Sequence, residues 1–514
     1  METVRQVIEH HASQSPERTF VVAPESGRML NYGQLKTSVD EISGRLDGLG
    51  LEQGGKIAFL LNNGYWTIQL FLGVMAANRI IVPLNAVAGK VQLVHVLGHS
   101  DTEVVLVSAD YREKLNEIMA SIDRDIRVIE VDHLTGPVWP ELDTSLSLKS
   151  KPNAPDAEDT ALLLYTSGST GLPKGAVISN RAVVNGGRNV TEAHQLTPQD
   201  RALCVLPIYH INGAMVTVSA PLFSGGSIVM PERFSAKNYW SLVAEFECTW
   251  SSIVPTIIKY LLDRIDQESF EFGNDPRLAK FRFARSASAP LAAVTLNQWE
   301  DTFQIPMIET LGLTETAGTV ASNPLPPLPH KPGSVGLPYG NEIIIVDDQG
   351  NECSPEVVGE LTIRGQNLLN YYYKNPEATE SSIIDGWFLT GDLGKKDADG
   401  YLFITGRSKE LIIRGGENIA PREIDDVLYM HEAILEAAAV GVDDENYGQE
   451  VVACVVVRDG YECTEDELKA FCTEGVGIYK CPKIIYFMDD LPKGPSGKIL
   501  RLQLPAIIEA LKAQ

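Results

Sequence analysis

The densest group of side chains suited to binding phosphate lies at residues 166–175, Thr-Ser-Gly-Ser-Thr-Gly-Leu-Pro-Lys-Gly. Its three glycines permit left-handed backbone conformations and let amide N–H groups approach anionic oxygens closely. Hydroxyl groups add further donors, and Lys174 adds positive charge. The segment lacks the Gly-Lys-Ser/Thr ending of a Walker loop. Because it follows the apolar residues 161–165, we expect a phosphate-binding loop beside a buried strand rather than a flexible surface loop.

Three further segments hold residues suited to the rest of a magnesium nucleotide. Thr314 and Glu315 put a hydroxyl beside a carboxylate, and Mg²⁺ prefers one or two carboxylates together with substrate phosphates. Asp392 can accept hydrogen bonds from ribose hydroxyls, and Lys498 lies in a glycine-flanked loop. Taken singly, each has an ordinary explanation: a capping threonine, an aspartate in a turn and a solvated lysine.

The elements that must position these residues follow an alternating pattern up to about residue 400. Apolar, β-branched runs predict strands at residues 161–165, 227–230 and 342–346, and amphipathic stretches predict helices at residues 32–49 and 238–246. Residues 347–351 predict a hairpin turn. Strands that alternate with helices indicate an α/β architecture with largely parallel sheets.

The pattern changes after the polar residues 395–400 and the short apolar run at 401–405. From residue 408 onward the order is β-α-β-β-α-β over about a hundred residues, the size of a small domain. One helix there begins with a capping-box pattern at Thr464. We expect two domains, residues 1–407 and 408–514, with a hinge near residues 407–409.

Composition restricts the class of protein. The 514 residues suggest about two to four domains. With 44% hydrophobic and 22% charged residues, the chain is neither disordered nor collagen-like. It has 43 Lys and Arg against 68 Asp and Glu, a net charge of −25. With no basic run to offset that charge, we expect no binding to nucleic acid or to anionic membranes.

The chain shows no targeting or membrane signal. Residues 1–5 are charged and lack the apolar core of a signal peptide, and the most apolar stretch, residues 70–84, is too short to span a bilayer. The seven cysteines include no Cys-x-x-Cys pair and are odd in number. We therefore expect reduced thiols in a cytoplasmic protein.

Taken together, in this order and at these separations, the four segments resemble those of the adenylate-forming superfamily, which includes acyl-CoA synthetases, adenylation domains and firefly luciferases. The resemblance extends to residues 406–412 and 414–419 and covers nearly the whole chain. It implies a large N-terminal domain of mixed and parallel sheets with flanking helices, and a small mobile α+β domain. It also implies the chemistry: ATP and a carboxylic acid form an acyl-adenylate and pyrophosphate with Mg²⁺, and a thiol such as coenzyme A then attacks the adenylate.

The resemblance assigns roles by matching position. The loop that grips the β- and γ-phosphates would comprise Thr166, Ser167, Gly168, Ser169, Thr170, Gly171 and Lys174. Thr314 would contact the α-phosphate, Glu315 would hold Mg²⁺, Asp392 would bind the ribose, and Arg407 would reach ribose or phosphate. Lys498 would bridge the acid and the α-phosphate.

Three more positions concern the second half of the reaction and the adenine. The small domain would rotate about Lys409, withdrawing Lys498 and bringing Gly415 and Gly416 to line a tunnel for the pantetheine arm of coenzyme A. At Leu311 the chain departs from the family, which usually has an aromatic residue there to stack on adenine. Here we expect an aliphatic surface for the base.

Residues 206–213 match the family segment that contributes the acyl pocket and its gate, including His210 and Asn212. An enzyme that activates amino acids would have an aspartate here to pair with the substrate ammonium. Because none is present, an amino-acid substrate is disfavoured. His210 is common in acyl-CoA synthetases and indicates the class rather than the substrate. Its alternative explanation is a histidine packed in the core.

The substrate class depends on Arg285 and Ser286, within residues 282–290, Arg-Phe-Ala-Arg-Ser-Ala-Ser-Ala-Pro. Oxalate–CoA ligases look similar here and at residues 322–326 and 330–336. An arginine beside the acyl pocket suits a second anionic group, because its planar fork holds a carboxylate or sulfonate with two hydrogen bonds. This predicts a small acid of the oxalate, malonate or sulfoacetate type. The alternative is that Arg285 pairs with a protein carboxylate outside the pocket.

The acceptor is inferred from the resemblance alone. The sequence ends soon after Lys498 without a carrier domain, which favours free coenzyme A. The first alternative is a stand-alone adenylation enzyme that loads a carrier protein. The second is a non-catalytic nucleotide-binding relative, which Lys498, Glu315 and Asp392 disfavour. The expected partners are thus a small carboxylic acid, ATP and coenzyme A, and the sequence is also compatible with a homodimer.

Overall fold

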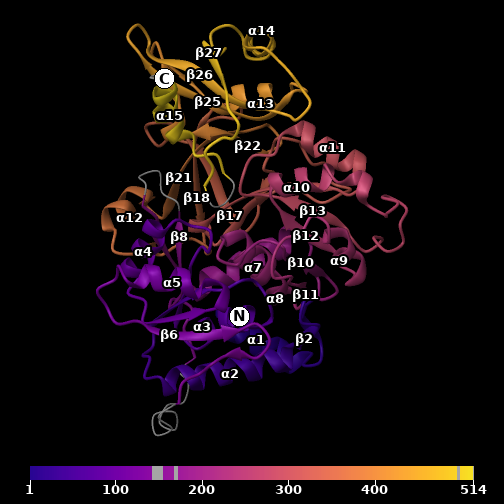
Figure 1. Cartoon of the computed structure of the whole chain (residues 1–514), viewed down its shortest axis with the longest axis vertical. Helices are drawn as coiled ribbons and strands as arrows, with labels where there is room; N and C mark the ends of the chain where they lie inside the picture. The colour runs from indigo at the N-terminus through magenta and orange to yellow at the C-terminus, as the bar shows by residue number, and fades with distance from the viewer. Residues whose placement is uncertain (142–153, 167–171, 495–497, 513–514) are drawn as a thin grey trace.

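The computed structural model describes residues 1–141, 154–166, 172–494 and 498–512. These residues form four β-sheets with helices packed on their faces. The N-terminal part, in indigo and magenta, occupies one end of the long axis, and the last sheet, in yellow and orange, occupies the other (Figure 1).

The first sheet has nine strands in the order β16-β15-β14-β13-β12-β10-β11-β1-β2. Its central strands, from β14 to β1, run parallel, whereas β2, β15 and β16 pair antiparallel at the two edges. The strands are β1 (Thr19–Ala23), β2 (Arg28–Asn31), β10 (Arg201–Leu203), β11 (Ser227–Val229), β12 (Trp250–Ile253), β13 (Phe283–Ser286), β14 (Met307–Leu313), β15 (Gly318–Ser322) and β16 (Leu337–Pro338).

The second sheet has eight strands in the order β19-β9-β8-β4-β3-β5-β6-β7. Strands β8, β4, β3, β5 and β6 are parallel, and β9 closes an antiparallel hairpin on β8. The strands are β3 (Lys56–Leu60), β4 (Ile80–Pro83), β5 (Val104–Val107), β6 (Arg127–Asp132), β7 (Gly136–Pro137), β8 (Thr160–Thr166), β9 (Lys174–Ser179) and β19 (Tyr371–Tyr372).

Helices separate and cover these two sheets. Helix α7 (Asn180–Ala193) contacts β15 of the first sheet and both β8 and β9 of the second, and the π-helical segment η2 (Asn212–Ser219) packs beside it. The largest apolar cluster accordingly combines both sheets with the helices between them. The remaining helices of this part are α1 (Val4–Gln14), α2 (Tyr32–Gly48), α3 (Tyr65–Ala76), α4 (Lys90–His99), α5 (Arg112–Met119), α8 (Ala220–Ser224), α9 (Tyr239–Glu245), α10 (Pro255–Leu262) and α11 (Ala293–Phe303).

The third sheet is antiparallel, with strands in the order β17-β18-β21-β20 and β22 paired to β21. It consists of β17 (Asn341–Val346), β18 (Gly359–Gly365), β20 (Ile383–Ile384), β21 (Trp387–Lys396) and β22 (Leu402–Arg407), and helix α12 (Pro376–Ser382) precedes β20. Strands β21 and β22 form the hairpin that precedes the C-terminal domain.

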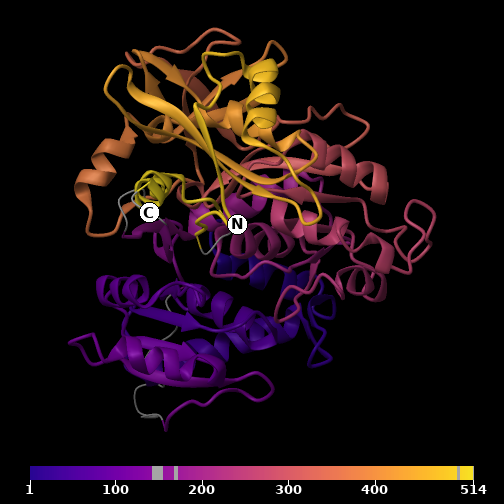
Figure 2. The same cartoon turned by 45° about the horizontal axis from the view of Figure 1, so that its top comes forward.

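The fourth sheet forms the C-terminal domain, which Figure 2 shows stacked over the N-terminal part. Its strands are β23 (Ile412–Arg414), β24 (Glu417–Ile419), β25 (Ile434–Asp444), β26 (Gly448–Val457) and β27 (Ile484–Phe487). Alternate residues of β25 and β26 point to opposite faces. One face packs on α13 (Pro421–Tyr429) and α14 (Glu465–Val476), and the other on α15 (Leu504–Lys512).

The expected α/β architecture with a large and a small domain is confirmed, as are the strands β8, β11 and β17 and the helices α2 and α9. The Thr464 hydroxyl accepts a hydrogen bond from the Glu467 amide at the start of α14, as the capping pattern predicts. The order predicted for the small domain was incomplete. Where one strand was predicted first, the structure has a hairpin of two three-residue strands, β23 and β24. A further helix, α15, follows β27. Three residues are too few to show a periodicity.

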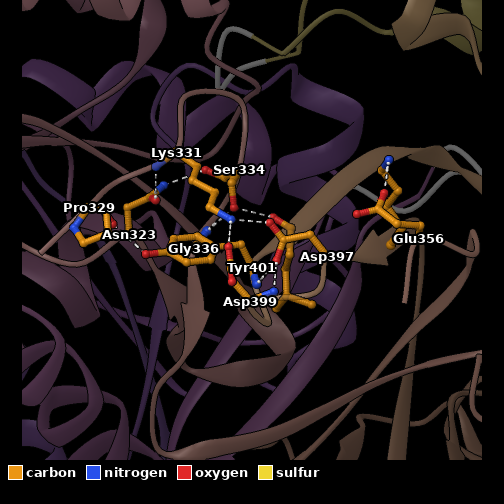
Figure 3. Close-up of polar contacts among 11 residues, drawn as sticks. Asn323, Pro329, Lys331, Ser334, Gly336, Glu356, Asp397, Asp399 and Tyr401 are labelled. Atoms are coloured by element: carbon orange, nitrogen blue, oxygen red, sulfur yellow. Dashed lines mark hydrogen bonds and ion pairs between the residues drawn. The ribbon is translucent and has the colours of Figure 1, made fainter. Parts of the chain in front are cut away.

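Figure 3 shows how the connection between β15 and β17 is fastened to the turn of the β21–β22 hairpin. The Lys331 ammonium contacts Asp397 at 2.6 Å and Asp399 at 2.7 Å and lies 4.4 Å from the Tyr401 ring centroid. The Ser334 hydroxyl donates to the Leu402 carbonyl at 2.8 Å. These contacts explain how residues 330–336 are held in place. The sequence had predicted no function for these residues.

The cysteines and the lengths of the helices bear on the expected redox state and on membrane insertion. The seven cysteines are free thiols, as predicted. None of the helices in the part of the chain that the structure describes has both the length and the apolar run that a membrane span requires.

Candidate active site

The predicted phosphate-binding segment begins at the last residue of β8 and ends in β9. Thr166 and Lys174 face each other as the last paired residues of the two strands. The hairpin therefore presents both at the mouth of the loop that it closes. The other loop residues predicted to bind phosphate, Ser167, Gly168, Ser169, Thr170 and Gly171, lie outside the described residues.

Thr314 and Glu315 lie in a single 3₁₀ turn, η4 (Thr314–Thr316), directly after β14. The Thr316 side chain is buried, and its hydroxyl accepts a hydrogen bond from the Leu313 amide at 3.0 Å. This contact closes the turn, so that Thr314 and Glu315 are presented at the carboxyl end of a parallel strand. Ligands of open α/β sheets bind at this edge.

Tyr372 connects Glu315 to the phosphate-binding hairpin. Its hydroxyl donates to Glu315 Oε1 at 2.8 Å, and the Lys174 ammonium lies 4.7 Å from its ring centroid. Burial and the Glu315 charge raise the pKa of Tyr372, so it remains a donor. Sequence reasoning missed this residue. The only signal is three consecutive tyrosines at 371–373, and nothing local distinguishes the second.

Asp392 and Arg407 lie opposite each other on β21 and β22. Arg407 Nε contacts Asp392 Oδ1 at 2.8 Å, and the Asp392 side chain is buried. Burial raises the pKa of Asp392, although Arg407 and Lys498 act in the opposite direction. The register of the hairpin thus explains why Asp392, the predicted ribose ligand, lies beside Arg407, which is predicted to reach ribose or phosphate.

Lys498 belongs to the C-terminal domain, but it lies close to residues of the N-terminal domain that are predicted to bind the nucleotide. The Gly494 amide donates to its carbonyl at 2.7 Å, and a β-bridge joins Lys493 to Ile499. Lys498 is exposed, yet desolvation by the groups packed around its ammonium lowers its pKa. The charges close enough to shift that pKa are those of Arg407, Asp392, Glu315 and Glu410. Folding therefore brings together Glu315, Asp392, Arg407 and Lys498, which were predicted from separate segments.

A second group of side chains lies on one face of the first sheet, near the ends of three parallel strands. Ser252, Arg285 and Thr310 each lie two residues beyond a buried apolar residue of the same strand. Because strand side chains alternate between faces, the three share the face that packs on α7 and η2. The apolar residues that define this face are Trp250, Phe283 and Ile308.

Asn212 begins η2 and connects this face to the predicted acyl pocket. The Ser252 hydroxyl donates to Asn212 Oδ1 at 2.7 Å, and Asn212 Nδ2 donates to the Ser288 hydroxyl at 3.3 Å. His210, two residues earlier, is close enough to Lys498 to be affected by its charge. Burial, together with that charge, lowers the pKa of His210 to about 4, so the ring is neutral near pH 7.

Arg285 is 1% exposed and donates through Nη2 to the Thr310 hydroxyl. Within the described residues its Nε and Nη1 have no hydrogen-bond partner, and no carboxylate forms an ion pair with it. The alternative in which Arg285 pairs with a protein carboxylate is therefore not supported. Burial lowers its pKa to about 9. A guanidinium buried without an anion is costly, so the two unpartnered nitrogens indicate an anionic ligand.

Ser286 lies next to Arg285, but its side chain belongs to the opposite face of β13, with Ala284. Its carbonyl accepts a hydrogen bond from the Thr310 hydroxyl at 3.3 Å. The structure thus connects Ser286 to the Arg285 face through its backbone, and a substrate contact of its hydroxyl stays a prediction. Thr310 itself was missed by sequence reasoning, because its importance depends on an arginine from the neighbouring strand.

His194 is a buried imidazole beside this face, 5.1 Å from the Phe283 ring. Both of its ring nitrogens lack a hydrogen-bond partner within the described residues. Burial and the charges of Arg285 and Arg282 hold its pKa well below the ordinary value of about 6.5. The folded state therefore takes up fewer protons than the unfolded state below pH 6.5, and His194 makes the protein less stable as the pH falls.

We predict that His194→Phe weakens this pH dependence. From pH 7.5 to pH 5.5, the free energy of unfolding of the variant should fall by about 1.4 kcal/mol less than that of the wild type, the value for one histidine that stays neutral only when folded. Urea unfolding at the two pH values measures the difference. His10→Phe, a change at a partly exposed histidine, is the control. Equal pH dependence in wild type and His194→Phe would contradict the prediction.

The remaining predicted positions lie in the C-terminal domain or at its start. Lys409 is in the short turn η5 (Ser408–Glu410). Gly415 and Gly416 form the turn between β23 and β24, with φ of +57° and +87°, which favours glycine. The nearest side chains to Gly415 are Tyr447 and Tyr479, both of the C-terminal domain.

Leu311 is partly buried against the apolar cluster of the third sheet. It therefore offers an aliphatic surface, as its residue type implies. Its contact with adenine stays a prediction.

The fold and this site define an AMP-binding enzyme. Residues 8–373 match the family of AMP-binding enzymes, and residues 423–498 match the AMP-binding enzyme C-terminal domain. The chain belongs to this family, and the expected resemblance to the adenylate-forming enzymes is confirmed.

Individual relatives are similar over almost their whole length. The chain is 43% identical to sulfoacetate–CoA ligase of Cupriavidus necator, over 98% of this chain and 97% of that protein. It is 34% identical to oxalate–CoA ligase of Arabidopsis thaliana, with 97% of each chain covered. Among solved structures, o-succinylbenzoate coenzyme A synthetase of Bacillus subtilis in complex with ATP and magnesium is 27% identical, with a TM-score of 0.85 and coverage of 97% and 98%.

Proposed function

We propose that this protein is an ATP-dependent acid–CoA ligase that acts on a small carboxylic acid with a second anionic group, of which sulfoacetate is the first candidate. The observation that carries the substrate class is Arg285, which is buried with no carboxylate partner among the described residues and with two unpartnered nitrogens. A sulfonate or carboxylate would accept hydrogen bonds from the guanidinium and offset its buried charge. The names of two relatives, a sulfoacetate–CoA and an oxalate–CoA ligase, support the same class.

In the first half-reaction a carboxylate oxygen of the acid attacks the α-phosphorus of ATP, and the bond to pyrophosphate breaks. Both reactants are anionic, so fixed positive charge must offset their repulsion. We assign this role to Lys498, with Thr314 donating to the α-phosphate and Lys174 close to the other phosphates. Asp392 would accept hydrogen bonds from the ribose hydroxyls, and Arg407 would reach ribose or phosphate.

Magnesium fits this arrangement through Glu315. Within the described residues no group of three or more His, Cys, Asp and Glu side chains could hold a metal ion alone. A single carboxylate beside triphosphate oxygens is how Mg²⁺ is commonly bound with nucleotides. Tyr372 orients Glu315 through Oε1. When bound, Mg²⁺ would neutralise part of the triphosphate charge.

In the second half-reaction the thiol of coenzyme A would attack the acyl-adenylate carbonyl carbon and release AMP. We propose that residues 408–514 then rotate about Lys409 as a separate domain from residues 1–407. The rotation would withdraw Lys498 and bring the Gly415–Gly416 turn to the pantetheine tunnel. A carrier protein as acceptor is the second candidate, because its pantetheine arm offers the same thiol. A cytoplasmic location stays part of the proposal.

The test is a substrate panel with ATP and Mg²⁺, in which pyrophosphate release and thioester formation are both measured. We expect turnover with sulfoacetate, oxalate or malonate and little with acetate, benzoate or octanoate. Pyrophosphate release without a CoA thioester would favour the carrier-protein alternative. Preference for benzoate or octanoate would contradict the second-anion pocket, and binding of ATP without any turnover would favour the non-catalytic alternative.

A further inference from the structure

Arg501 follows Lys498 by three residues and makes more contacts than the other charged side chains near it. Its Nη2 contacts Asp425 Oδ2 at 2.5 Å, and its Nε contacts Glu410 Oε2 at 3.3 Å. Its Nη1 donates to the Ala439 carbonyl. The Arg501 side chain is only 12% exposed, so the guanidinium is held on all three nitrogens in a largely buried position.

These contacts join three separate parts of the chain to the loop that carries Lys498. Asp425 lies on α13, Ala439 lies on β25, and Glu410 is the last residue of η5, directly after Lys409. The Asp425 carboxylate also accepts the Ala439 amide at 2.6 Å. Arg501 therefore connects the start of the C-terminal domain to its core, and connects both to the backbone close to Lys498.

The chain that precedes Lys498 is also held by ion pairs and a hydrogen bond. Lys493 contacts Glu436 at 2.8 Å and Asp490 at 2.6 Å. The Leu500 amide donates to the Pro492 carbonyl at 2.7 Å. The described residues on the two sides of the loop are thus fixed to each other, and Arg501 connects them to Glu410 in the segment that follows Lys409.

We propose that Arg501 is a positioning residue for acyl-adenylate formation. It joins residues 498–501, α13 and the residues after Lys409 into one rigid unit, so that a rotation about Lys409 is transmitted in full to the Lys498 ammonium. Planar, two-pronged contacts with carboxylates suit this role, because they fix direction as well as distance. The inference rests on the proposed roles of Lys498 and Lys409.

The test compares the two half-reactions in Arg501→Ala, Arg501→Lys and Glu410→Gln. A misplacement of about 1 Å can lower a rate by about 100-fold, and we expect a loss of about 10- to 100-fold in the kcat of adenylation for Arg501→Ala. The KM values for ATP and acid should change little, because those ligands bind the N-terminal domain. Thioester formation from supplied acyl-adenylate should keep its rate, since Lys498 is withdrawn in that step. Arg501→Lys should recover part of the loss.

Glu410→Gln keeps the Asp425 contact and the fold, so it isolates the connection to the hinge. We expect a smaller loss, again confined to adenylation. Lys469→Ala, which removes an ion pair with Glu465 within α14, is the control and should have wild-type rates. Equal losses in both half-reactions, or unchanged adenylation in Arg501→Ala, would overturn the inference. If Lys498→Ala still forms adenylate, the proposed role of Lys498 fails instead, which separates the two outcomes.

Discussion

Replacing Lys498 by alanine is expected to lower the rate of acyl-adenylate formation by about 10²–10³-fold, the usual loss when a preorganised donor to developing charge is removed. Lys498 reaches a site shared with Arg407, Asp392 and Glu315, where burial lowers its pKa. The two anions it would bridge raise that pKa again, so the ammonium form is retained in the complex. Single-turnover release of pyrophosphate, measured without coenzyme A, reports this step alone.

Two comparisons make the Lys498 result specific. Lys498→Arg keeps the charge but not the shape and should recover only part of the rate. Thioester formation from supplied acyl-adenylate should stay within a few fold of the wild type. If Lys498→Ala slowed both half-reactions equally, the lysine would support the fold rather than adenylation.

Replacing Arg285 by leucine is expected to change which acid is used. Hydrogen bonds to charged groups contribute about 1.5–3 kcal/mol each, so losing two should lower kcat/KM for an acid with two anionic groups by about 10²–10⁴-fold. Acetate has no second anion, and its kcat/KM should change little. The measurement is kcat/KM for sulfoacetate, oxalate, malonate and acetate in both proteins.

The same substitution is expected to stabilise the protein without ligand. Replacing buried charge by an apolar side chain of similar volume commonly adds about 1–4 kcal/mol. Arg285 is 1% exposed, and two of its nitrogens have no partner in the described parts of the chain. Arg282→Leu is the matched control, because Arg282 contacts Asp200 at 2.8 Å. That variant should be less stable and keep its substrate preference. Destabilisation in Arg285→Leu, or equal losses for all acids, would contradict the assignment.

Much of the nucleotide site could be predicted from local sequence. Thr314 and Glu315 are adjacent, and the hydroxyl and lysine groups at residues 166–175 are contiguous, so their chemistry does not depend on distant contacts. The strands β8, β11 and β17 were predictable for a related reason, since a buried strand has a continuous apolar run. The short hairpin β23–β24 has no such run and was missed.

Other parts of the site depend on pairings that no local pattern reveals. Tyr372 reaches Glu315 because β19 pairs with β9 at the edge of the second sheet. Thr310 meets Arg285 because β13 and β14 are neighbours in register. Arg501 contacts Glu410 across 91 residues of sequence. In each case the residue type alone does not suggest a role, and the proposed role depends on which residues the fold places beside it.

By itself the sequence determined the class of protein, through its resemblance to the adenylate-forming enzymes, and the alternation of strands and helices, which is a property of residue type and short spacing. The phosphate, magnesium and ribose ligands that this resemblance implies stay predictions. Only the tertiary structure decided whether Arg285 has a carboxylate partner. The desolvation of a charge depends on everything packed around it. The same residue on an exposed strand would carry no information about the substrate. Buried on the face shared with Ser252 and Thr310, without a carboxylate partner among the described residues, it supports the proposal that the acid has a second anionic group.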